Sequence, residues 1–393
     1  MKAVRNKEDS SRIITCLAFF TWGLTMLCRT AFGYYMEPLH LTATQAGAAN
    51  FLTSFCVCIS AIAVSRFAEH RNWQLPVLVA ELLVCAAAVT MLSLFRSYPM
   101  VLVSKALLGV GCGPMFTLLM TMTERAGTPE QYPTNAGIVA NGEAILATIM
   151  GPVLIVFLLS NLGFGWTNGV LAAFLLLLAA FWRLCGRRIH GGAPAKAAAV
   201  APVCKVLGSR NVRLCMIGGS CSLVACWCIY VYAPTMLLEA GCYSSSTMSM
   251  IMTMMGMFMA LWMLFLPYLS NKIGRKPVVL LFSLLGAAAL FTLYRWAARP
   301  ALVLIFILFG GCCSVISMIY MAILPVDSVP AEEAATAVSL INATGELMGA
   351  SVGPLLAGLI ADAAGMRYGM LFASLSMVAA AAAALFLVKP PAS

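Results

Sequence analysis

Long apolar segments alternate with short polar connections along almost the whole chain. Each segment reaches roughly 20 residues or more, the length that a helix needs to cross a hydrocarbon core of about 30 Å. The pattern predicts an all-α membrane protein. Its twelve predicted spans lie near residues 12–36, 44–66, 74–95, 99–123, 134–160, 166–185, 211–238, 246–270, 277–296, 300–323, 333–361 and 367–388.

The longest polar connection lies in the middle of the chain, at residues 186–210. It contains glycines and prolines, which break helices and favour turns. We therefore expect an N-terminal six-helix bundle at 1–185, a cytoplasmic linker at 186–210 and a C-terminal six-helix bundle at 211–393.

The two predicted bundles repeat one another in sequence. A shift of 203 positions places Gly142-Glu143 on Gly345-Glu346, and a shift of 202 or 203 continues the correspondence through most of each half. Such self-similarity is typical of an internal duplication. It predicts two pseudo-symmetric bundles.

The composition supports a lipid environment. Hydrophobic residues make up 62% of the chain and charged residues 10%, against about a quarter charged in a soluble domain. The apolar run after Met1–Arg12 shows no small-residue cleavage site, so it is predicted to be a spanning helix and not a signal peptide.

Basic residues are unevenly distributed between the predicted connections. With the N-terminus placed inside, eighteen of the 24 basic residues fall in inward segments and four in outward segments. Because cytoplasmic connections are enriched in Lys and Arg, we expect both termini and the linker to be cytoplasmic and the membrane to be the inner one. The net charge of +10 then reflects topology and contact with anionic headgroups, which argues against nucleic-acid binding.

A basic loop, Pro267-Tyr-Leu-Ser-Asn-Lys-Ile-Gly-Arg-Lys276, follows the eighth predicted span. It resembles the Gly-x-Leu-x-Asp-Arg-x-Gly-Arg-Lys signature of the major facilitator superfamily, and Gly274, Arg275 and Lys276 stand at matching positions. Asn271 replaces the aspartate of the signature, which argues against a charge relay through that position. A plain positive-inside anchor would use the same cations.

Further segments extend this resemblance over nearly the whole chain. A degraded copy of the loop at residues 65–74 retains Glu69. Together with Gly274, Arg275 and Lys276 it forms the set of candidate gating residues. The segment Lys105–Gly113 resembles the family's Arg-x-x-x-Gly-x-Gly sequence, and Gly151-Pro152 resembles its Gly-Pro segment. The resemblance implies a two-bundle fold and transport by alternating access, although close helix packing alone would also explain the glycines.

Five ionisable residues lie well inside predicted spans: Arg29, Glu81, Lys105, Glu143 and Glu346. Each costs at least ~2.5 kcal/mol at a helix centre, so each is expected to face a partner or a hydrated cavity. They are the strongest functional signal in the sequence.

Arg29 and Lys105 lie at equal depth, each about six residues from the outer end of its span. The resemblance implies that spans one and four line the central path, so these two cations are predicted to bind an anionic substrate. Arginine offers a planar fork to a carboxylate, and lysine a movable point charge. Alternatively, each cation pairs with an acid such as Glu81, or Lys105 extends to the membrane surface.

Glu143 and Glu346 are related by the duplication and lie near the middle of the membrane. A buried carboxyl group is more readily neutral than charged, so both are predicted to carry coupled protons. The alternative is a protonated glutamate that forms a hydrogen bond between helices.

Aromatic and sulfur-containing side chains complete the candidate site. Tyr34, Trp227 and Tyr230 are predicted to line the substrate cavity, although aromatic residues near span ends are more often interfacial. The eighth span holds eight methionines between Met248 and Met263. Thioethers on one helical face bind cuprous copper, but a flexible core filler is the commoner role of methionine.

These observations predict a secondary transporter that moves a small organic anion, a carboxylate, with proton coupling. The runner-up is a proton-driven multidrug efflux antiporter, and copper transport is a lesser alternative. The sequence contains no recognisable catalytic or metal-binding motif and no soluble domain for ATP hydrolysis, so we expect no enzyme, no cofactor and no metal. The expected partners are the small molecule, protons and membrane lipid, and the expected state is a monomer.

Overall fold

The computed structural model describes residues 2–71, 73–128, 131–185 and 202–388. These residues form helices and no strand, and eleven of their helices are long and apolar enough to span a membrane. One of the eleven, Thr134–Cys185, has 52 residues and covers two predicted spans. The prediction of an all-α membrane protein is thereby confirmed.

Gly163 explains why eleven candidate spans are found where twelve were predicted. It interrupts α7 (Met150–Cys185) with φ 75° and ψ 171°, a left-handed conformation that glycine adopts readily. α7 therefore consists of two helical limbs. The two spans merge because their connection contains only this one non-helical residue.

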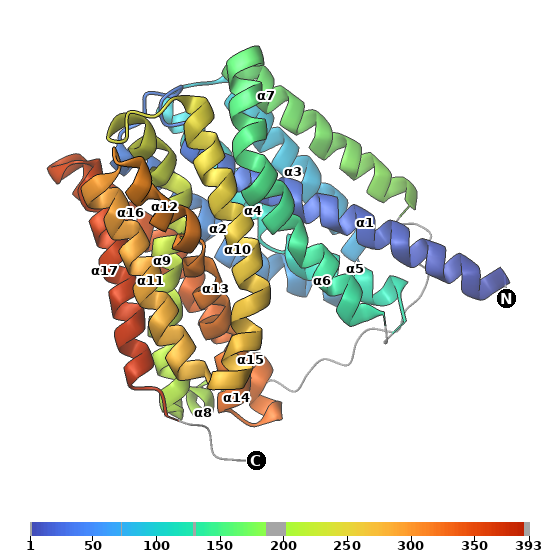
Figure 1. Cartoon of the computed structure of the whole chain (residues 1–393). Coiled ribbons are helices and arrows are strands. Elements are labelled where there is room, and N and C mark those ends of the chain that lie inside the picture. Colours follow the sequence, from blue (N-terminus) through green and yellow to red (C-terminus); the bar gives the residue numbers. More distant parts are fainter. Residues whose placement is uncertain (1, 72, 129–130, 186–201, 389–393) are drawn as a thin grey trace. The chain divides into compact units, whose positions relative to one another are not determined.

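The chain forms two compact units. Unit 1 comprises Met1–Leu39 and Leu52–Ala195, and unit 2 comprises His40–Phe51 and Lys196–Ser393 (Figure 1). The helix α2 (Ala43–His70) thus begins in unit 2 and continues in unit 1. Of the predicted linker, residues 186–201 lie outside the described part of the chain.

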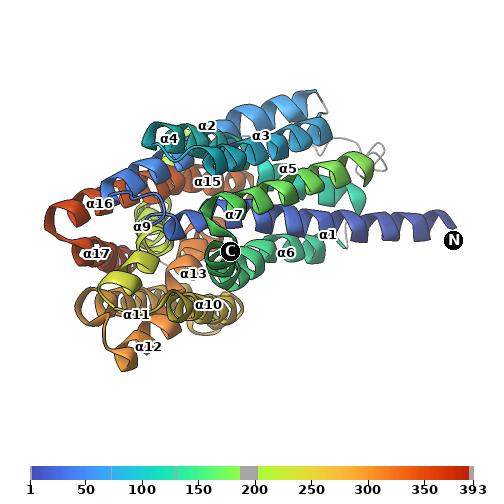
Figure 2. The same cartoon turned by 90° about the horizontal axis from the view of Figure 1, so that it is seen from above.

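Unit 1 is built from the helices of the first half. They are α1 (Lys2–Thr30), η1 (Ala31–Tyr34), the larger part of α2, α3 (Gln74–Leu94), α4 (Tyr98–Cys112), α5 (Met115–Ala126), α6 (Tyr132–Gly142), η2 (Glu143–Ile149) and α7. Within this unit α3 packs along α4, as Figure 2 shows, and also along α7.

Unit 2 holds the helices of the second half. They are α8 (Val203–Gly208), α9 (Arg210–Glu239), α10 (Ser245–Ile273), α11 (Arg275–Trp296), α12 (Pro300–Phe309), α13 (Cys312–Met318), η4 (Ile319–Ile323), α14 (Leu324–Ser328), α15 (Ala331–Thr344), η5 (Gly345–Val352), α16 (Gly353–Ala364) and α17 (Met366–Leu385). Within this unit α17 packs against α11 and α9.

Glycines allow the closest helix contacts in both units. A Cβ atom at Gly23 of α1 would lie 2.5 Å from the carbonyl oxygen of Gly142 in α6. In unit 2, a Cβ atom at Gly349 of η5 would lie 2.7 Å from the carbonyl oxygen of Ser220 in α9. Small residues therefore let the backbones meet without intervening side chains.

The segments η2, η4 and η5 are π-helical, a feature that the hydrophobic pattern did not predict. Two of them begin at the duplicated Gly-Glu pairs: η2 starts at Glu143, and η5 starts at Gly345. A π-helical turn widens the helix and is frequent at functional sites. The duplication therefore repeats a local backbone irregularity as well as a side chain.

Candidate functional site

Two buried cations lie close together in unit 1. Arg29 is in the last turn of α1 and is 4% exposed, and Lys105 is in α4 and is 1% exposed. The guanidinium group is near enough for its charge to act on the ammonium group. Arg29 also donates a hydrogen bond from Nη2 to the Ser54 hydroxyl of α2, at 2.8 Å.

The Lys105 ammonium group packs on an aromatic ring. Its Nζ lies 4.2 Å from the centre of the buried Phe32 ring in η1, a distance at which the ring face attracts a cation. At 1% exposure, the side chain does not extend to the surface of the protein.

Glu81 of α3 does not neutralise Lys105. Within the described ranges, neither Glu81 nor Lys105 takes part in an ion pair. Glu81 is 6% exposed, and its Oε2 atom is buried without a hydrogen-bond partner. The pairing of Lys105 with Glu81, which the sequence left open, is therefore not found.

The duplicated glutamates occupy equivalent positions in the two units. Glu143 of η2 and Glu346 of η5 are each half-buried. Five residues later, Thr148 donates a hydrogen bond to the carbonyl oxygen of Glu143 at 3.5 Å, and Ser351 donates one to the carbonyl oxygen of Glu346 at 3.0 Å. Each glutamate is thus anchored by its backbone to one π-helical turn.

The aromatic candidates divide between the units. Tyr34 is half-buried at the end of η1, the element that also carries Phe32. Trp227 and Tyr230 of α9 are 4% and 8% exposed, with ring centres 5.7 Å apart in an edge-to-face arrangement. The Tyr230 hydroxyl contacts the sulfur of Met259 at 3.8 Å.

The methionines of α10 form two faces. Met248, Met252, Met255 and Met259 are each 2% exposed and follow one another at spacings of three or four residues. Met250, Met254 and Met257 are exposed on the rest of the helix. The buried row has the spacing of a core-packing stripe.

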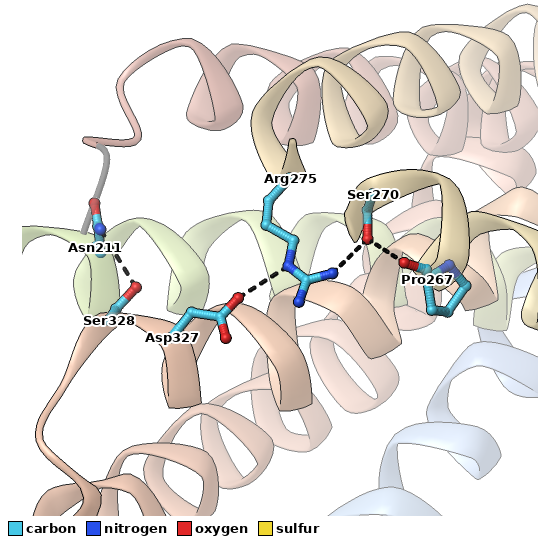
Figure 3. Close-up of polar contacts among 6 residues, drawn as sticks. All are labelled: Asn211, Pro267, Ser270, Arg275, Asp327 and Ser328. Carbon is cyan, nitrogen blue, oxygen red and sulfur yellow. Dashed lines mark hydrogen bonds and ion pairs between the residues drawn. The ribbon is translucent and has the colours of Figure 1, made fainter. Parts of the chain in front are cut away.

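The basic loop joins three parts of unit 2 (Figure 3). Gly274 has φ 96° between α10 and α11, a conformation that glycine adopts without strain. The next residue, Arg275, pairs with Asp327 of α14 at 2.9 Å and donates a hydrogen bond to the Ser270 hydroxyl at 2.6 Å. Lys276 donates hydrogen bonds to the carbonyl oxygens of Leu385 and Leu387.

The first-half copy of the loop is seen less fully. Glu69 lies in the last turn of α2, and its side chain falls outside the described part. Its predicted gating role stays a prediction.

Asp362 of α16 is a polar anchor that the sequence analysis missed. Its Oδ1 accepts a hydrogen bond from the backbone N–H of Ala43 at 2.9 Å, and its Oδ2 accepts one from Thr44 at 2.8 Å. The Tyr232 hydroxyl bonds the carbonyl oxygens of Ala43 at 3.1 Å and Pro354 at 2.6 Å. All four contacts lie within unit 2, and three of them hold the first turn of α2 there.

Comparison with known proteins identifies the family. The sequence profile described as Major Facilitator Superfamily matches residues 13–350, and again residues 215–393. No match was found among the curated proteins.

Solved structures of transporters share the fold at low sequence identity. A bacterial homologue of the human lysosomal transporter Spinster, in an inward-facing and unoccupied conformation, matches with a TM-score of 0.81 at 12% identity, covering 96% of each chain. The nucleoside transporter NupG matches with a TM-score of 0.76 at 15% identity, covering 96% of this chain and 100% of that one. With the profile match over most of its length, the chain belongs to the major facilitator superfamily of secondary transporters.

Proposed function

We propose that this transporter moves a small organic anion, a carboxylate, by alternating access with proton coupling. In this proposal it is a monomer without enzymatic activity, in the inner membrane, with both termini in the cytoplasm. The supporting observation is the pair of buried cations Arg29 and Lys105, of which Lys105 has no ion-pair partner among the described residues.

An anion would relieve the electrostatic cost of this pair. Two like charges in a low-dielectric environment repel each other, and each also loses its hydration. A carboxylate that reaches both groups would accept hydrogen bonds from the guanidinium fork and from the ammonium group. Phe32, beside the ammonium group, supplies an apolar wall for the rest of a small organic molecule.

The duplicated glutamates provide the proposed proton sites. A protonated carboxyl group is neutral and avoids the cost of a charge inside a membrane. Glu143 and Glu346 lie at π-helical turns, one in each unit. In our proposal, binding and release of a proton at these positions accompanies the exchange between the two access states.

α2 links the proposed movement to specific hydrogen bonds. Its first turn is held by Asp362 and Tyr232 in unit 2, while residues from Leu52 onward belong to unit 1. A displacement of one unit against the other must therefore bend α2 or detach its first turn.

Uptake into proteoliposomes tests the cationic site. Arg29→Gln and Lys105→Gln should each raise the concentration for half-maximal uptake of a small carboxylate by about 10- to 100-fold, the loss expected for a hydrogen bond to a charged group. Lys205→Gln removes one exposed charge of α8 and should leave uptake unchanged. Unchanged uptake in both site variants would show that the cationic-site assignment is wrong.

Drug efflux remains the second candidate, because Gly151-Pro152 lies in the first turn of α7, just beyond the π-helical turn of Glu143. Proton-driven efflux would need Glu143 but not Arg29. Cells that express an efflux pump would resist cationic dyes, would lose that resistance with Glu143→Gln and would keep it with Arg29→Gln.

A further inference from the structure

An apolar groove runs along one side of unit 1. It has a volume of about 410 Å³ and is lined by α1, η2 and both limbs of α7. All thirteen lining residues are apolar, among them Phe20, Leu24, Leu146, Leu177 and Phe181. The groove contains none of the candidate site residues.

The lining residues lie in membrane-spanning helices, and several of them are exposed. Phe174, Leu177 and Phe181 are 53%, 54% and 50% exposed, within the candidate span Thr134–Cys185. At this depth the solvent is hydrocarbon. A groove left empty would lose the dispersion contacts of its lining, and the most abundant molecule that fits a narrow apolar channel is a lipid acyl chain.

One end of the groove leads toward positive charge. Phe20 marks this end, next to the 2.8 Å hydrogen bond from the Trp182 indole to the Thr21 hydroxyl. Cys16 and Arg12 continue the four-residue row of Phe20 along α1, so the exposed Arg12 lies on the same helical face two turns away. Arg12 also lies near the start of the candidate span Ser11–Tyr34, and we expect the lipid headgroups at this end of the helix.

We propose that the groove binds one acyl chain of an anionic phospholipid, whose phosphate group lies at Arg12. The apolar walls select the chain, and the arginine selects the headgroup. This lipid site is independent of the transported substrate.

Photochemical labelling tests the chain-binding part. The full protein is placed in phosphatidylcholine vesicles with a trace of phosphatidylglycerol that carries a photoreactive acyl chain, and labelled peptides are mapped. Leu177→Trp fills the groove, and displacement of two methylene groups should reduce labelling of α1 and α7 by about tenfold. Leu176→Trp places the same side chain at a neighbouring exposed position outside the groove and should leave labelling unchanged.

A second matched pair of variants distinguishes a loss of lipid binding from misfolding. Leu154 lines the groove from the other limb of α7, and the exposed Val153 beside it does not. Leu154→Trp should reduce labelling and Val153→Trp should not. Equal labelling within both pairs would overturn the proposal, because the label would then report ordinary lipid contact.

The headgroup part needs a comparison of two probes with the same photoreactive chain. Phosphatidylglycerol should label the groove about five times more than phosphatidylcholine, and Arg12→Gln should remove that preference. Arg183→Gln is the control, because Arg183 is exposed but lies nine residues after Phe174, on the opposite face of the helix. Equal labelling by both lipids, or a preference that survives Arg12→Gln, would contradict an anionic lipid at this position.

Discussion

The two units share a duplicated framework but differ at the positions of the buried cations. A shift of 202 or 203 places Arg29 on Val231 or Tyr232, and Lys105 on Ile307 or Leu308. Unit 2 therefore has uncharged side chains where unit 1 has two cations. In contrast, both units have a glutamate at the corresponding position. It is Glu143 in unit 1 and Glu346 in unit 2, each at a π-helical turn.

This difference separates two kinds of residue. Features present in both units, such as the glutamates, the π-helical turns and the Gly-Pro pairs, suit a role in movement or proton coupling that both halves perform. Features present in one unit suit the recognition of a particular substrate. At the position of Arg29, unit 2 uses Tyr232 to hold two backbone carbonyl groups, which is a structural role.

Reversal of the charge at Lys105 should produce the largest effect. Lys105→Glu would place a carboxylate where we propose that a carboxylate substrate binds, and repulsion between like charges costs several kcal/mol. We expect uptake of the anion to fall by more than about 100-fold. Ile307→Gln introduces a polar group at the matching position of unit 2 and should reduce uptake less; an equal loss would remove the distinction between the units.

If the features present in both units serve proton coupling, substitution of either glutamate should have the same effect. Glu143→Gln and Glu346→Gln each remove a group that binds and releases a proton while they keep its shape. We expect both variants to lose stimulation of uptake by a pH gradient and to retain exchange of substrate across the membrane. If only one variant loses stimulation, the two positions have different roles.

Tyr232 of unit 2 stands at the position that corresponds to Arg29 of unit 1. Tyr232→Phe tests whether its role there is structural. The change removes a buried hydroxyl that serves the carbonyl oxygens of Ala43 and Pro354. We expect a loss of about 1–2 kcal/mol in the free energy of unfolding. Thermal unfolding followed with a thiol-reactive dye measures it, because many of the cysteines are buried. Wild-type stability would show that this hydroxyl is dispensable.

Asp362→Ala should have a somewhat smaller effect on stability. It leaves the N–H groups of Ala43 and Thr44 without their carboxylate acceptor, and loss of a helix N-terminal acceptor costs about 0.5–2 kcal/mol. Asp362→Asn retains one acceptor oxygen and should lie between Asp362→Ala and the wild type.

The smallest effect is expected at an exposed cation of unit 2, in contrast to the buried cations of unit 1. Lys205 is exposed and pairs with Glu333 at 2.5 Å; its hydrogen bond to that carboxylate raises the pKa of Lys205. Because the folded pKa lies above the unfolded one, the pair contributes stability at neutral pH and loses it as the pH rises through the folded pKa. Glu333→Gln should therefore lower the melting temperature slightly at neutral pH, with a smaller difference in strongly alkaline solution.

The spans could be predicted from sequence because hydrocarbon thickness sets a fixed length for an apolar helix. The boundary near Gly163 was predicted as well, since it lies between the predicted spans 134–160 and 166–185. The sequence did not show that the connection is a single non-helical residue. The π-helical turns were also missed, because one extra residue in a helical turn does not alter an apolar composition.

The candidate site was only partly predictable. Equal depth in two spans indicated that Arg29 and Lys105 could lie near each other, and the charge of Arg29 does act on Lys105. Their role as a substrate site stays a prediction. Ser54 and Phe32 were not foreseen as their neighbours, because helix rotation decides which side chains of α2 and η1 face the cations. Asp362 was missed because it lies near the end of its span, where a charge carries little penalty and gives no signal.

The division of α2 has a consequence for expression of the protein as two separate polypeptides. A fragment that starts in the central connection would contain Asp362, Tyr232 and Ala350, but not the Ala43–Phe51 segment that pairs with them. Such a half should be insoluble or rapidly degraded when made alone, and co-expression with the complementary fragment should restore it. Expressed apart, the two halves would therefore have to exchange this segment to complete unit 2.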